Sequence, residues 1–471
     1  MVPRNAPLAF WVLACLALAP AASANDWNNS GGNSGRNGLS GELGPDGAHL
    51  LWSGGPTSII AWQPVIEGRR VFVVRQTGFP ENEPKASPIV ALDLDTGQEL
   101  WVRHLDYNPG DWTTWIAGVR DGKVYASRSG NGATVSANIY ALDAANGQTV
   151  WVSEDQVDAG AYDGVVFAPD GDLIVGSFED LWRIDAEDGT TVWHSPRSGS
   201  VSGTCGAALF GDAVYVIDAV SGGHVVVRFD LATGVQMYCS PLMPGFTIQN
   251  TPMVAPDGTI YVSRTQDNPA VDYFYAFEDD GSQITIKWSC PAGWTTHSEF
   301  GVGPDGSVYM ISPSYEVLRL DPQTGQALDS SGPLAGFSKP RMAVDCAGRV
   351  FVSNGAFDAG RLYSFNADLT LRWSVPVPNV NIGGPALGES GTLVICGVGN
   401  DVRAYRTSRG DLNCDGVVDG FDIQPFVLAL IDPAAYAAAY PSCYWMYADC
   451  NGDGAVDGFD VQPFVALLAG G

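Results

Sequence analysis

A short phrase recurs eight times along this chain and constrains its fold more than any other feature of the sequence. Each copy is a turn with glycine followed by an alternating apolar strand, beginning at Glu67, Asp121, Asp170, Phe210, Asp257, Asp305, Ala347 and Ser390. A second phrase follows seven of these copies and ends at Trp101, Trp151, Trp193, Tyr238, Trp288, Asp329 and Trp373. Alternation with a period of two predicts strands, and glycine or asparagine in the turn supplies the positive φ that a tight hairpin needs. Each repeat is therefore predicted to be a unit of four antiparallel strands.

Units of this kind predict a closed ring. A four-stranded sheet of roughly 45 residues cannot cover both of its faces, so neighbouring units stack, and closing the stack leaves only short protected edges. The last unit has predicted strands near Gly384–Leu387, Thr392–Cys396 and Val402–Tyr405, and the orphan strand that ends at Trp52 supplies its fourth. We therefore predict an all-β fold, an eight-bladed β-propeller over residues 25–406 in which an N-terminal strand joins the C-terminal strands.

The second phrase, A-x-D-x-x-T-G-x-x-x-W, resembles the repeat of the pyrroloquinoline-quinone (PQQ) type family, which includes quinoprotein dehydrogenases and the BamB outer-membrane assembly factor. The lead-in W-N-N-S-G-G-N-S-G-R-N-G from Trp27 is similar to that of BamB-like members. Two units depart from the pattern, because the fourth ends in Tyr238 and the sixth lacks a terminal aromatic residue. The resemblance implies the propeller fold but not one function, since the same ring carries enzymes and non-catalytic binding proteins.

Two Asp-rich loops follow a short linker at residues 407–410. They read DLNCDGVVDGFD from Asp411 and DCNGDGAVDGFD from Asp449. Oxygen ligands at loop positions 1, 3, 5, 7, 9 and 12, with glycine at position 6, form the spacing that wraps a chain segment around Ca²⁺. The sequence predicts two calcium ions, bound by Asp411, Asn413, Asp415, the Val417 carbonyl, Asp419 and Asp422, and by Asp449, Asn451, Asp453, the Ala455 carbonyl, Asp457 and Asp460.

The tandem over residues 411–471, with a helix after each loop, resembles a type I dockerin. The family docks onto a cohesin module, so the resemblance implies a cohesin-like or envelope partner, with Gly420, Phe421, Gly458 and Phe459 at the positions that help to choose it. The helices are predicted to carry apolar stripes that include Phe426, Val427 and Leu430 in the first. We also expect a disulfide here, between Cys414 and Cys443. The alternative is that the loops are structural calcium clips without a partner.

The N-terminal residues predict export. Arg4 precedes an apolar run from Leu8 to Ala19, and Ala22-Ser23-Ala24 has the small-residue pattern of a cleavage site. We assign residues 1–24 to a signal peptide and expect a secreted, periplasmic or cell-surface protein. Lipid attachment at Cys15 is disfavoured because the apolar run continues beyond it. The eight remaining cysteines, an even number in an oxidising compartment, favour disulfides over reactive thiols.

Charge excludes one class of partner. The chain has 24 Lys+Arg against 52 Asp+Glu and a formal net charge of −28. Affinity for phosphate backbones comes from cationic side chains, so nucleic acid is not an expected partner. No stretch after the signal peptide approaches the roughly 20 apolar residues of a membrane span.

The sequence carries no catalytic constellation that we recognise. Adjacent cysteines of the kind that quinoprotein alcohol dehydrogenases carry are missing, so PQQ is not an expected cofactor. The recurrent Asp residues of the second phrase, such as Asp93 and Asp143, are interpreted as turn formers. Aromatic and polar residues in loops that enter the inner strands would line a funnel for a peptide or glycan, or pack at the core rim: Trp112, Trp115, Phe246, Trp294, His297 and Glu299.

The function predicted from the sequence is therefore a secreted, non-catalytic binding protein. Its ring would bind a protein or polysaccharide, and its tail would anchor it in a calcium-dependent manner. The alternatives are a quinoprotein-type oxidoreductase or polysaccharide-degrading component with a dockerin, and a BamB-like outer-membrane assembly factor.

Overall fold

The computed structural model describes residues 27–76, 87–106, 111–129, 136–158, 164–198, 204–244, 251–264, 272–293, 300–334, 336–356, 358–440, 443–451 and 455–470. The predicted signal peptide, with Cys15, lies outside these residues. Within them, no helix is both long and apolar enough to cross a membrane.

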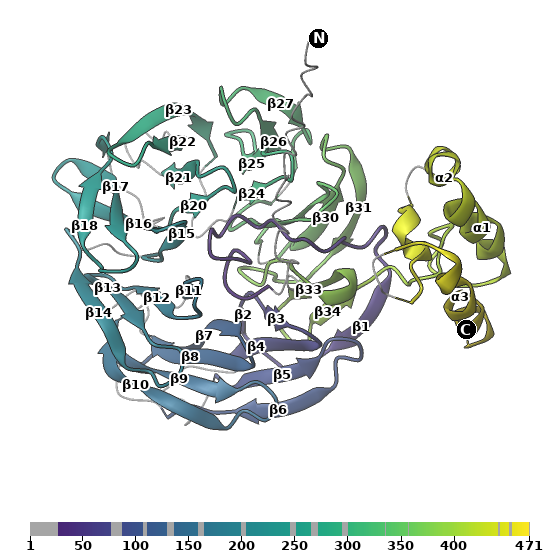
Figure 1. Ribbon diagram of the computed structural model, residues 1–471, viewed down its shortest axis with the longest axis horizontal. Coiled ribbons are helices and arrows are strands. Elements are labelled where there is room, and N and C mark those ends of the chain that lie inside the picture. The colour runs from purple at the N-terminus through teal and green to yellow at the C-terminus, as the bar shows by residue number, and fades with distance from the viewer. Residues whose placement is uncertain are drawn as a thin grey trace, which may run out of the picture.

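The described strands form eight antiparallel sheets arranged as the blades of a ring (Figure 1). The sheets are β2–β6, β7–β10, β11–β14, β15–β19, β20–β23, β24–β27, β28–β31, and β32–β34 with β1. The strands in chain order are β1 (Leu50–Gly54), β2 (Ile60–Ala61), β3 (Val65–Glu67), β4 (Arg70–Gln76), β5 (Ile89–Asp93), β6 (Glu99–Arg103), β7 (Thr113–Arg120), β8 (Lys123–Ser129), β9 (Ala137–Asp143), β10 (Thr149–Val157), β11 (Val166–Phe167), β12 (Leu173–Gly176), β13 (Asp180–Ile184), β14 (Thr191–Pro196), β15 (Ala208–Phe210), β16 (Ala213–Val220), β17 (Gly223–Asp230), β18 (Gln236–Cys239), β19 (Met243–Pro244), β20 (Met253–Val254), β21 (Ile260–Arg264), β22 (Asp272–Asp279), β23 (Ile284–Ala292), β24 (Gly301–Val302), β25 (Val308–Ile311), β26 (Val317–Leu320), β27 (Ala327–Ser330), β28 (Arg341–Val344), β29 (Val350–Ser353), β30 (Arg361–Phe365), β31 (Leu371–Pro376), β32 (Ala386–Gly388), β33 (Thr392–Cys396) and β34 (Val402–Tyr405). The all-β eight-bladed propeller is confirmed.

The eighth sheet combines strands from both ends of the ring. Strand β1 pairs antiparallel with β34, so that Trp52 lies opposite Ala404. The guanidinium of Arg75 in the first blade donates to the carbonyl oxygens of Pro56, at 2.7 Å, and Gly397, at 3.3 Å. These contacts join the first and last blades across a separation of more than 300 residues.

Aspartates and glycines of the second phrase build the turns against which the tryptophans pack. The Asp93 carboxylate accepts hydrogen bonds from the backbone N–H groups of Asp95 and Thr96, which confirms its role as a turn former. Trp101 donates its indole N–H to the Ala144 carbonyl of the next blade at 3.0 Å. Gly147, with φ of 72°, lies so close that a Cβ there would be 2.7 Å from the Trp101 ring. The same indole-to-carbonyl bond recurs at Trp52, Trp151, Trp193 and Trp288.

The fourth unit departs from this pattern both in the aromatic residue that ends its outer strand and in the glycine of the next turn. The next turn has no docking glycine, since Gly281 has open space around it. Tyr238 instead donates its hydroxyl to Asp279 at 2.7 Å, and Arg228 donates to the same carboxylate at 3.0 Å. A charged hydrogen-bond cluster therefore replaces the tryptophan contact between the fourth and fifth blades.

The segment before β1 lies against the inner strands of successive blades. In Figure 1 this purple segment crosses the centre of the ring. Its carbonyl oxygens accept backbone hydrogen bonds from Ile66, Val119, Leu209, Val254, Val302 and Val344, which belong to six blades. Asn29 and Ser34 contact the remaining inner strand among the first seven blades through the carbonyl oxygens of Val165 and Phe167. The lead-in motif is therefore part of the axial core.

A small helical module follows the ring (Figure 1). It contains α1 (Ile423–Ile431), α2 (Pro433–Ala439) and α3 (Val461–Gly470), with 3-10 turns at Gly420–Asp422, Trp445–Ala448 and Gly458–Asp460. Helices follow both Asp-rich loops, as predicted, whereas α2 was not predicted. The rings of Phe426 and Phe464 stack with centroids 4.0 Å apart and form the centre of the module.

One of the expected disulfides is present among the described residues. Cys414 and Cys443 are bonded, with Cα atoms 5.7 Å apart, which confirms the predicted pair. The broader expectation of disulfides is wrong for the six other described cysteines, which form no disulfide: Cys205, Cys239, Cys290, Cys346, Cys396 and Cys450. Cys205 and Cys396 are buried, where a thiol packs as a small apolar side chain.

Candidate metal centre

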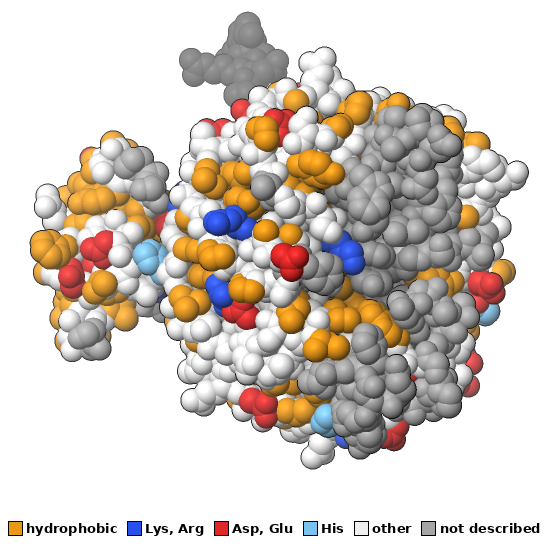
Figure 2. All heavy atoms as spheres, turned by 180° about the vertical axis from the view of Figure 1, so that it is seen from behind, with side chains coloured by type: hydrophobic (Ala, Val, Ile, Leu, Met, Phe, Trp, Pro, Cys, Tyr) orange, Lys and Arg blue, Asp and Glu red, His pale blue; other side chains and the backbone are white. Residues whose placement is uncertain are grey.

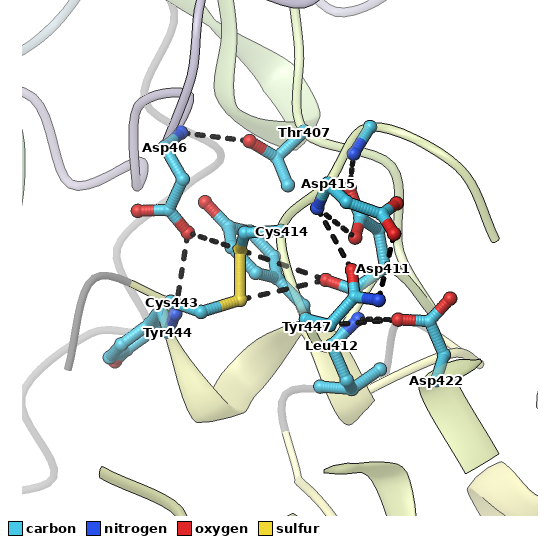
Figure 3. Close-up of a disulfide and its surroundings, with 12 residues drawn as sticks. Asp46, Thr407, Asp411, Leu412, Cys414, Asp415, Asp422, Cys443, Tyr444 and Tyr447 are labelled. Carbon is cyan, nitrogen blue, oxygen red and sulfur yellow. Dashed lines mark hydrogen bonds between the residues drawn. A yellow bond between two sulfur atoms is a disulfide. The ribbon is translucent and has the colours of Figure 1, made fainter. Parts of the chain in front are cut away.

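The first Asp-rich loop is organised around two buried carboxylates, Asp411 and Asp422. Asp411 accepts hydrogen bonds from the backbone N–H groups of Asp415, at 3.2 Å, and Gly416, at 3.0 Å. Asp422 accepts from Leu412 at 2.7 Å, and also from the N–H groups of Asn413 and Asp419. Asp422, at loop position 12, thereby holds the start of the loop, while Asp411, at position 1, holds its middle (Figure 3).

The charge balance of this loop favours a cation. Asp411 and Asp422 have no solvent-exposed surface, and the segment 410–471 contains no Lys, Arg or His. Burial, and then the neighbouring carboxylates of Asp422 and Asp415, raise the pKa of Asp411 to about 6. Buried carboxylates are stabilised by a paired cation or a metal. The donor set of hard oxygens fits Ca²⁺.

The other predicted ligands of the first loop lie on its exposed side. Asn413 donates its side-chain amide to the Asp415 carboxylate at 2.9 Å. Asp419 caps the following 3-10 turn by accepting from the Phe421 N–H at 2.8 Å. Val417, the predicted carbonyl ligand, is exposed.

The second loop repeats this design. Asp460 is buried and accepts from the N–H groups of Asn451, at 3.0 Å, and Asp457, at 2.9 Å. Asp449 is also buried, and Ala455 is exposed. Asp453 lies outside the described residues. Both loops therefore hold their position-12 carboxylate in the same way.

The predicted docking pairs stand at the start of the 3-10 turns that follow the loops. Phe421 is 77% exposed and Phe459 is 79% exposed. Gly420 and Gly458 are exposed beside them, with open space where a Cβ would lie. Both pairs are thus accessible on the surface of the module.

The module is held against the ring by residues that the sequence analysis did not identify. Figure 3 shows Asp46, from the segment before β1, beside the Cys414–Cys443 disulfide. Its carboxylate accepts from the Tyr444 N–H at 3.3 Å, and its backbone N–H donates to Thr407 at 2.8 Å. Asp46 also pairs with Arg349 and Arg372 of the seventh blade. No local motif marks these residues, because more than 300 positions separate Asp46 from both arginines.

Asp46, Cys414 and Cys443 bring three potential metal-ligand atoms, one carboxylate oxygen and two sulfur atoms, within 4.8 Å of one another. Both sulfur atoms are consumed by the disulfide, so neither is a thiolate ligand. This cluster is structural.

Residues of the segment before β1 and of several blades line a small cavity inside the ring. Its volume of about 30 Å³ is bounded by residues that include Ser30, Trp62, Trp115 and Arg341. Space of this size suits a water molecule. Trp115 is buried and donates to the Arg128 carbonyl at 3.2 Å, while Trp112 meets Trp62 edge to face at 5.7 Å.

Of the residues expected to line a funnel on the ring axis, the structure describes only some. Trp112 and Trp115 contribute to packing near the axis. Phe246, Trp294, His297 and Glu299 lie outside the described residues.

Known structures resemble the ring. The quinohemoprotein alcohol dehydrogenase of Comamonas testosteroni matches with a TM-score of 0.55 and 15% identity, over 81% of this chain and 80% of that chain. The computationally designed Ika8 protein matches with a TM-score of 0.53 and 13% identity, over 76% and 99%. BamB from Moraxella catarrhalis has a TM-score of 0.48 and 15% identity, over 73% and 94%. At these identities the first two likenesses show the fold alone.

No curated protein matches the chain. A family model described as "Outer membrane protein assembly factor BamB" matches residues 85–331, which span the second phrases ending at Trp101 through Asp329. Since this match covers more than half of the 471 residues, the chain belongs to the family described as outer membrane protein assembly factor BamB.

Proposed function

We propose that this chain is an exported, non-catalytic binding protein whose ring binds a protein or polysaccharide and whose dockerin-like tail binds two calcium ions and anchors it to a partner. The observation that carries the proposal is the pair of buried carboxylates, Asp411 and Asp422, held in a segment without a single basic residue. Exported proteins meet calcium at concentrations that suit such extracellular modules.

Calcium would convert an unfavourable feature into a stabilising one. Without a cation, the carboxylates of Asp411, Asp415 and Asp422 repel one another in a poorly solvated loop. With Ca²⁺ bound, the same oxygens become ligands, and binding energy adds to the folding energy of the module. Asp449, Asp457 and Asp460 would act in the same way in the second loop.

Anchoring follows from the exposed pairs Gly420–Phe421 and Gly458–Phe459. Aromatic side chains this exposed on a small module are suited to contact a partner. A cohesin-like or envelope protein is the partner that we propose, and either repeat would be able to present its pair.

Calcium titration of the mature full-length chain by calorimetry tests the proposal. We expect two bound ions, one lost in Asp411→Ala and both lost when Asp449→Ala is added. Asp188→Asn is the matched control, because this exposed ring carboxylate only caps a local turn with Thr190. If the unmodified chain binds no calcium, the proposal is wrong.

A second candidate is a BamB-like role in outer-membrane assembly, and the family match over residues 85–331 favours it. Deletion of the gene distinguishes the two. Loss of outer-membrane proteins from the envelope would support the assembly role, whereas an intact envelope with calcium-dependent loss of one bound partner would support anchoring.

The oxidoreductase and polysaccharide-degrading alternatives are tested by activity. Reconstitution with PQQ and Ca²⁺, followed by assays on alcohols, sugars and polysaccharides, should give no turnover. Sustained turnover would overturn the non-catalytic part of the proposal while leaving the calcium loops untouched.

A further inference from the structure

The two Asp-rich loops offer a cation the same ligands. Both carry Asp at positions 1, 5, 9 and 12 and Asn at position 3. The affinity of a calcium loop is set by the charge of its ligands and by the rigidity of the site. Because the ligand charges are equal, the rigidity with which the protein holds each loop decides which of the two binds Ca²⁺ more tightly.

The ring contacts the first loop at position 6. Gly416 has a φ of 95° there, and a Cβ on it would lie 2.5 Å from Nδ1 of His49. His49 belongs to the segment before β1, and its carbonyl oxygen accepts a hydrogen bond from the backbone N–H of Arg406 at 3.2 Å. Figure 2 shows that the module meets the ring along one side, with acidic side chains in red on its open surface. The ring thus fixes the side chain against which position 6 packs.

Position 4 of the first loop is held from two sides. Cys414 has a φ of 57°, a conformation that residues other than glycine keep only where their surroundings enforce it. Its disulfide with Cys443 ties it to the module. On the ring side, a carboxylate oxygen of Asp46 lies 3.2 Å from its Sγ atom, and Asp46 is itself fixed by Arg349 and Arg372. Asp46 and the disulfide together hold this turn.

The two contacts with the ring flank a ligand position. Asp415, at position 5, stands between Cys414 and Gly416 in the sequence. The backbone N–H groups of Asp415 and Gly416 donate to the Asp411 carboxylate, so the same turn orients the ligand at position 1. The ring therefore acts on the geometry of two carboxylate ligands, although its own contacting residues do not belong to the loop.

The second loop has no tether of the same kind at position 4. Gly452 occupies that position, and Cys450, at position 2, forms no disulfide. Asp449, at position 1, borders a cavity of about 320 Å³ whose other walls include Glu42 of the segment before β1. Residues 452–454 lie outside the described part of the chain. The disulfide and its contact with Asp46 thus distinguish the first loop from the second.

We propose that Asp46 and His49 are positioning residues for Ca²⁺ in the first loop, so that this loop binds the ion more tightly than the second loop does. The inference deepens the proposed calcium binding and rests on it. A loop that is already held in its turn loses less conformational freedom on binding, so more of the interaction with the ion appears as affinity. By linkage, an ion bound in the first loop also strengthens the attachment of the module to the ring.

Hydrogen exchange of the unmodified mature chain, measured by mass spectrometry during a Ca²⁺ titration, follows the two loops separately. The backbone N–H groups of Asn413 and Asn451 are matched reporters, because each donates to the position-12 carboxylate of its own loop. We expect segment 411–422 to become protected at a Ca²⁺ concentration at least about ten-fold lower than segment 449–460. Protection of both segments at the same concentration, or of the second segment first, would overturn the proposal.

Replacing His49 by Ala removes the side chain that packs against position 6. We expect the first loop to need about three- to ten-fold more Ca²⁺ for the same protection, while the second loop responds as before. His194→Ala is the matched control, since this ring histidine is 41% exposed on β14 in the third blade and should change neither loop. An equal shift at both loops, or no shift at the first, would contradict the positioning role of His49.

Two further variants test how the ring acts on the loop. His49→Phe keeps a planar ring against Gly416 and should leave the calcium response of the first loop close to that of the unmodified chain. A shift as large as that of His49→Ala would refute the packing explanation. Asp46→Ala should raise the Ca²⁺ requirement of the first loop alone, and an unchanged requirement would remove Asp46 from the proposal.

Calorimetry with Ca²⁺ alone separates failure of this inference from failure of the proposed function. Two ions bound with unequal affinity, the tighter one lost in Asp411→Ala, are the expected result. Two ions bound with equal affinity would refute the inference and leave the proposed calcium binding intact. An unmodified chain that binds no ion would refute both.

Discussion

The carboxylate of Asp46 lies 2.8 Å from the guanidinium of Arg349, and this ion pair is buried where the ring meets the module. Arg372 pairs with the same carboxylate at 2.5 Å. Arg349 also lies over the Tyr444 ring, with its guanidinium carbon 6.0 Å from the ring centroid. One side chain from the segment before β1 thus connects the seventh blade to the C-terminal module.

Replacing Asp46 by Ala should loosen this junction. Two buried guanidinium groups would lose their common carboxylate, and breaking a buried pair in this way costs about 3–5 kcal/mol. We expect a lower unfolding midpoint in denaturant and faster proteolysis between ring and module. Asp212→Ala is the control, because Asp212 is largely exposed in its pair with Arg228 and this pair should be worth less than about 1 kcal/mol. Equal effects of the two substitutions would contradict the assigned role of Asp46.

Gly147 should tolerate no side chain. An alanine there would adopt φ near 72° and place its Cβ 2.7 Å from the Trp101 ring, so it would strain the backbone and displace the docked indole. Gly122 has a similar φ of 74° with open space around it, so Gly122→Ala carries the backbone strain alone. Thermal unfolding should show a larger loss for Gly147→Ala, and a loss no greater than that of Gly122→Ala would contradict the docking argument.

The indole hydrogen bond itself can be isolated at Trp101. Trp101→Phe removes the donor to the Ala144 carbonyl while keeping an aromatic ring. We expect a loss of about 1–3 kcal/mol from the unpaired carbonyl and the reduced packing. Trp373 is a useful comparison, because its buried indole nitrogen has no hydrogen-bond partner among the described residues. Trp373→Phe should therefore cost less in the same denaturation experiment.

Asp345 should make stability depend on pH. Burial raises its pKa to about 6, above the value of about 3.9 in an unfolded chain, despite the opposing charge of Arg349. A raised carboxyl pKa favours the folded state below about pH 4 and loses this contribution as the pH rises through 6. The stability of the unmodified chain relative to Asp345→Asn should thus fall by up to about 3 kcal/mol between pH 4 and 7. A constant difference across this range would show that Asp345 does not titrate in it.

Removal of the disulfide should affect the module more than the ring. The bond closes a loop with a sequence separation of 29, for which the expected loss of stability is about 3.6 kcal/mol. In Cys414→Ser with Cys443→Ser, hydrogen exchange should rise in α1 and α2 first. Cys239→Ser, which removes an exposed free thiol, should leave the exchange unchanged. Uniform acceleration across the ring would argue against a local role.

Much of the ring follows from short-range patterns. Alternating apolar residues and D-x-x-T-G turns specify hairpins whose partners are neighbours in sequence, as Asp93 with Thr96 illustrates. The departures at Tyr238 and Asp329 were visible as well. The explanation for Tyr238 was not, because the Asp279 cluster that replaces the tryptophan contact belongs to the next blade.

The arrangement of the Asp-rich loops was equally predictable from the sequence, since both position-12 aspartates accept hydrogen bonds from backbone groups within a dozen residues. The exposure of Val427 could not be predicted from the sequence, because the spacing of apolar residues does not tell which of two apolar faces meets the core. The cysteine spacing also did not reveal that the other described cysteines form no disulfide.

The sequence by itself determined the repeat, the turn chemistry and the two oxygen-rich loops, because each depends on residues close together in the chain. Only the tertiary structure decided where the segment before β1 runs and how the module attaches. Those features depend on contacts such as Asp46 with Arg349 and Gly38 with Val344, which form between residues about 300 positions apart. Such pairs leave no periodic signal, since neither residue differs from an ordinary surface residue until the closed ring brings the two together.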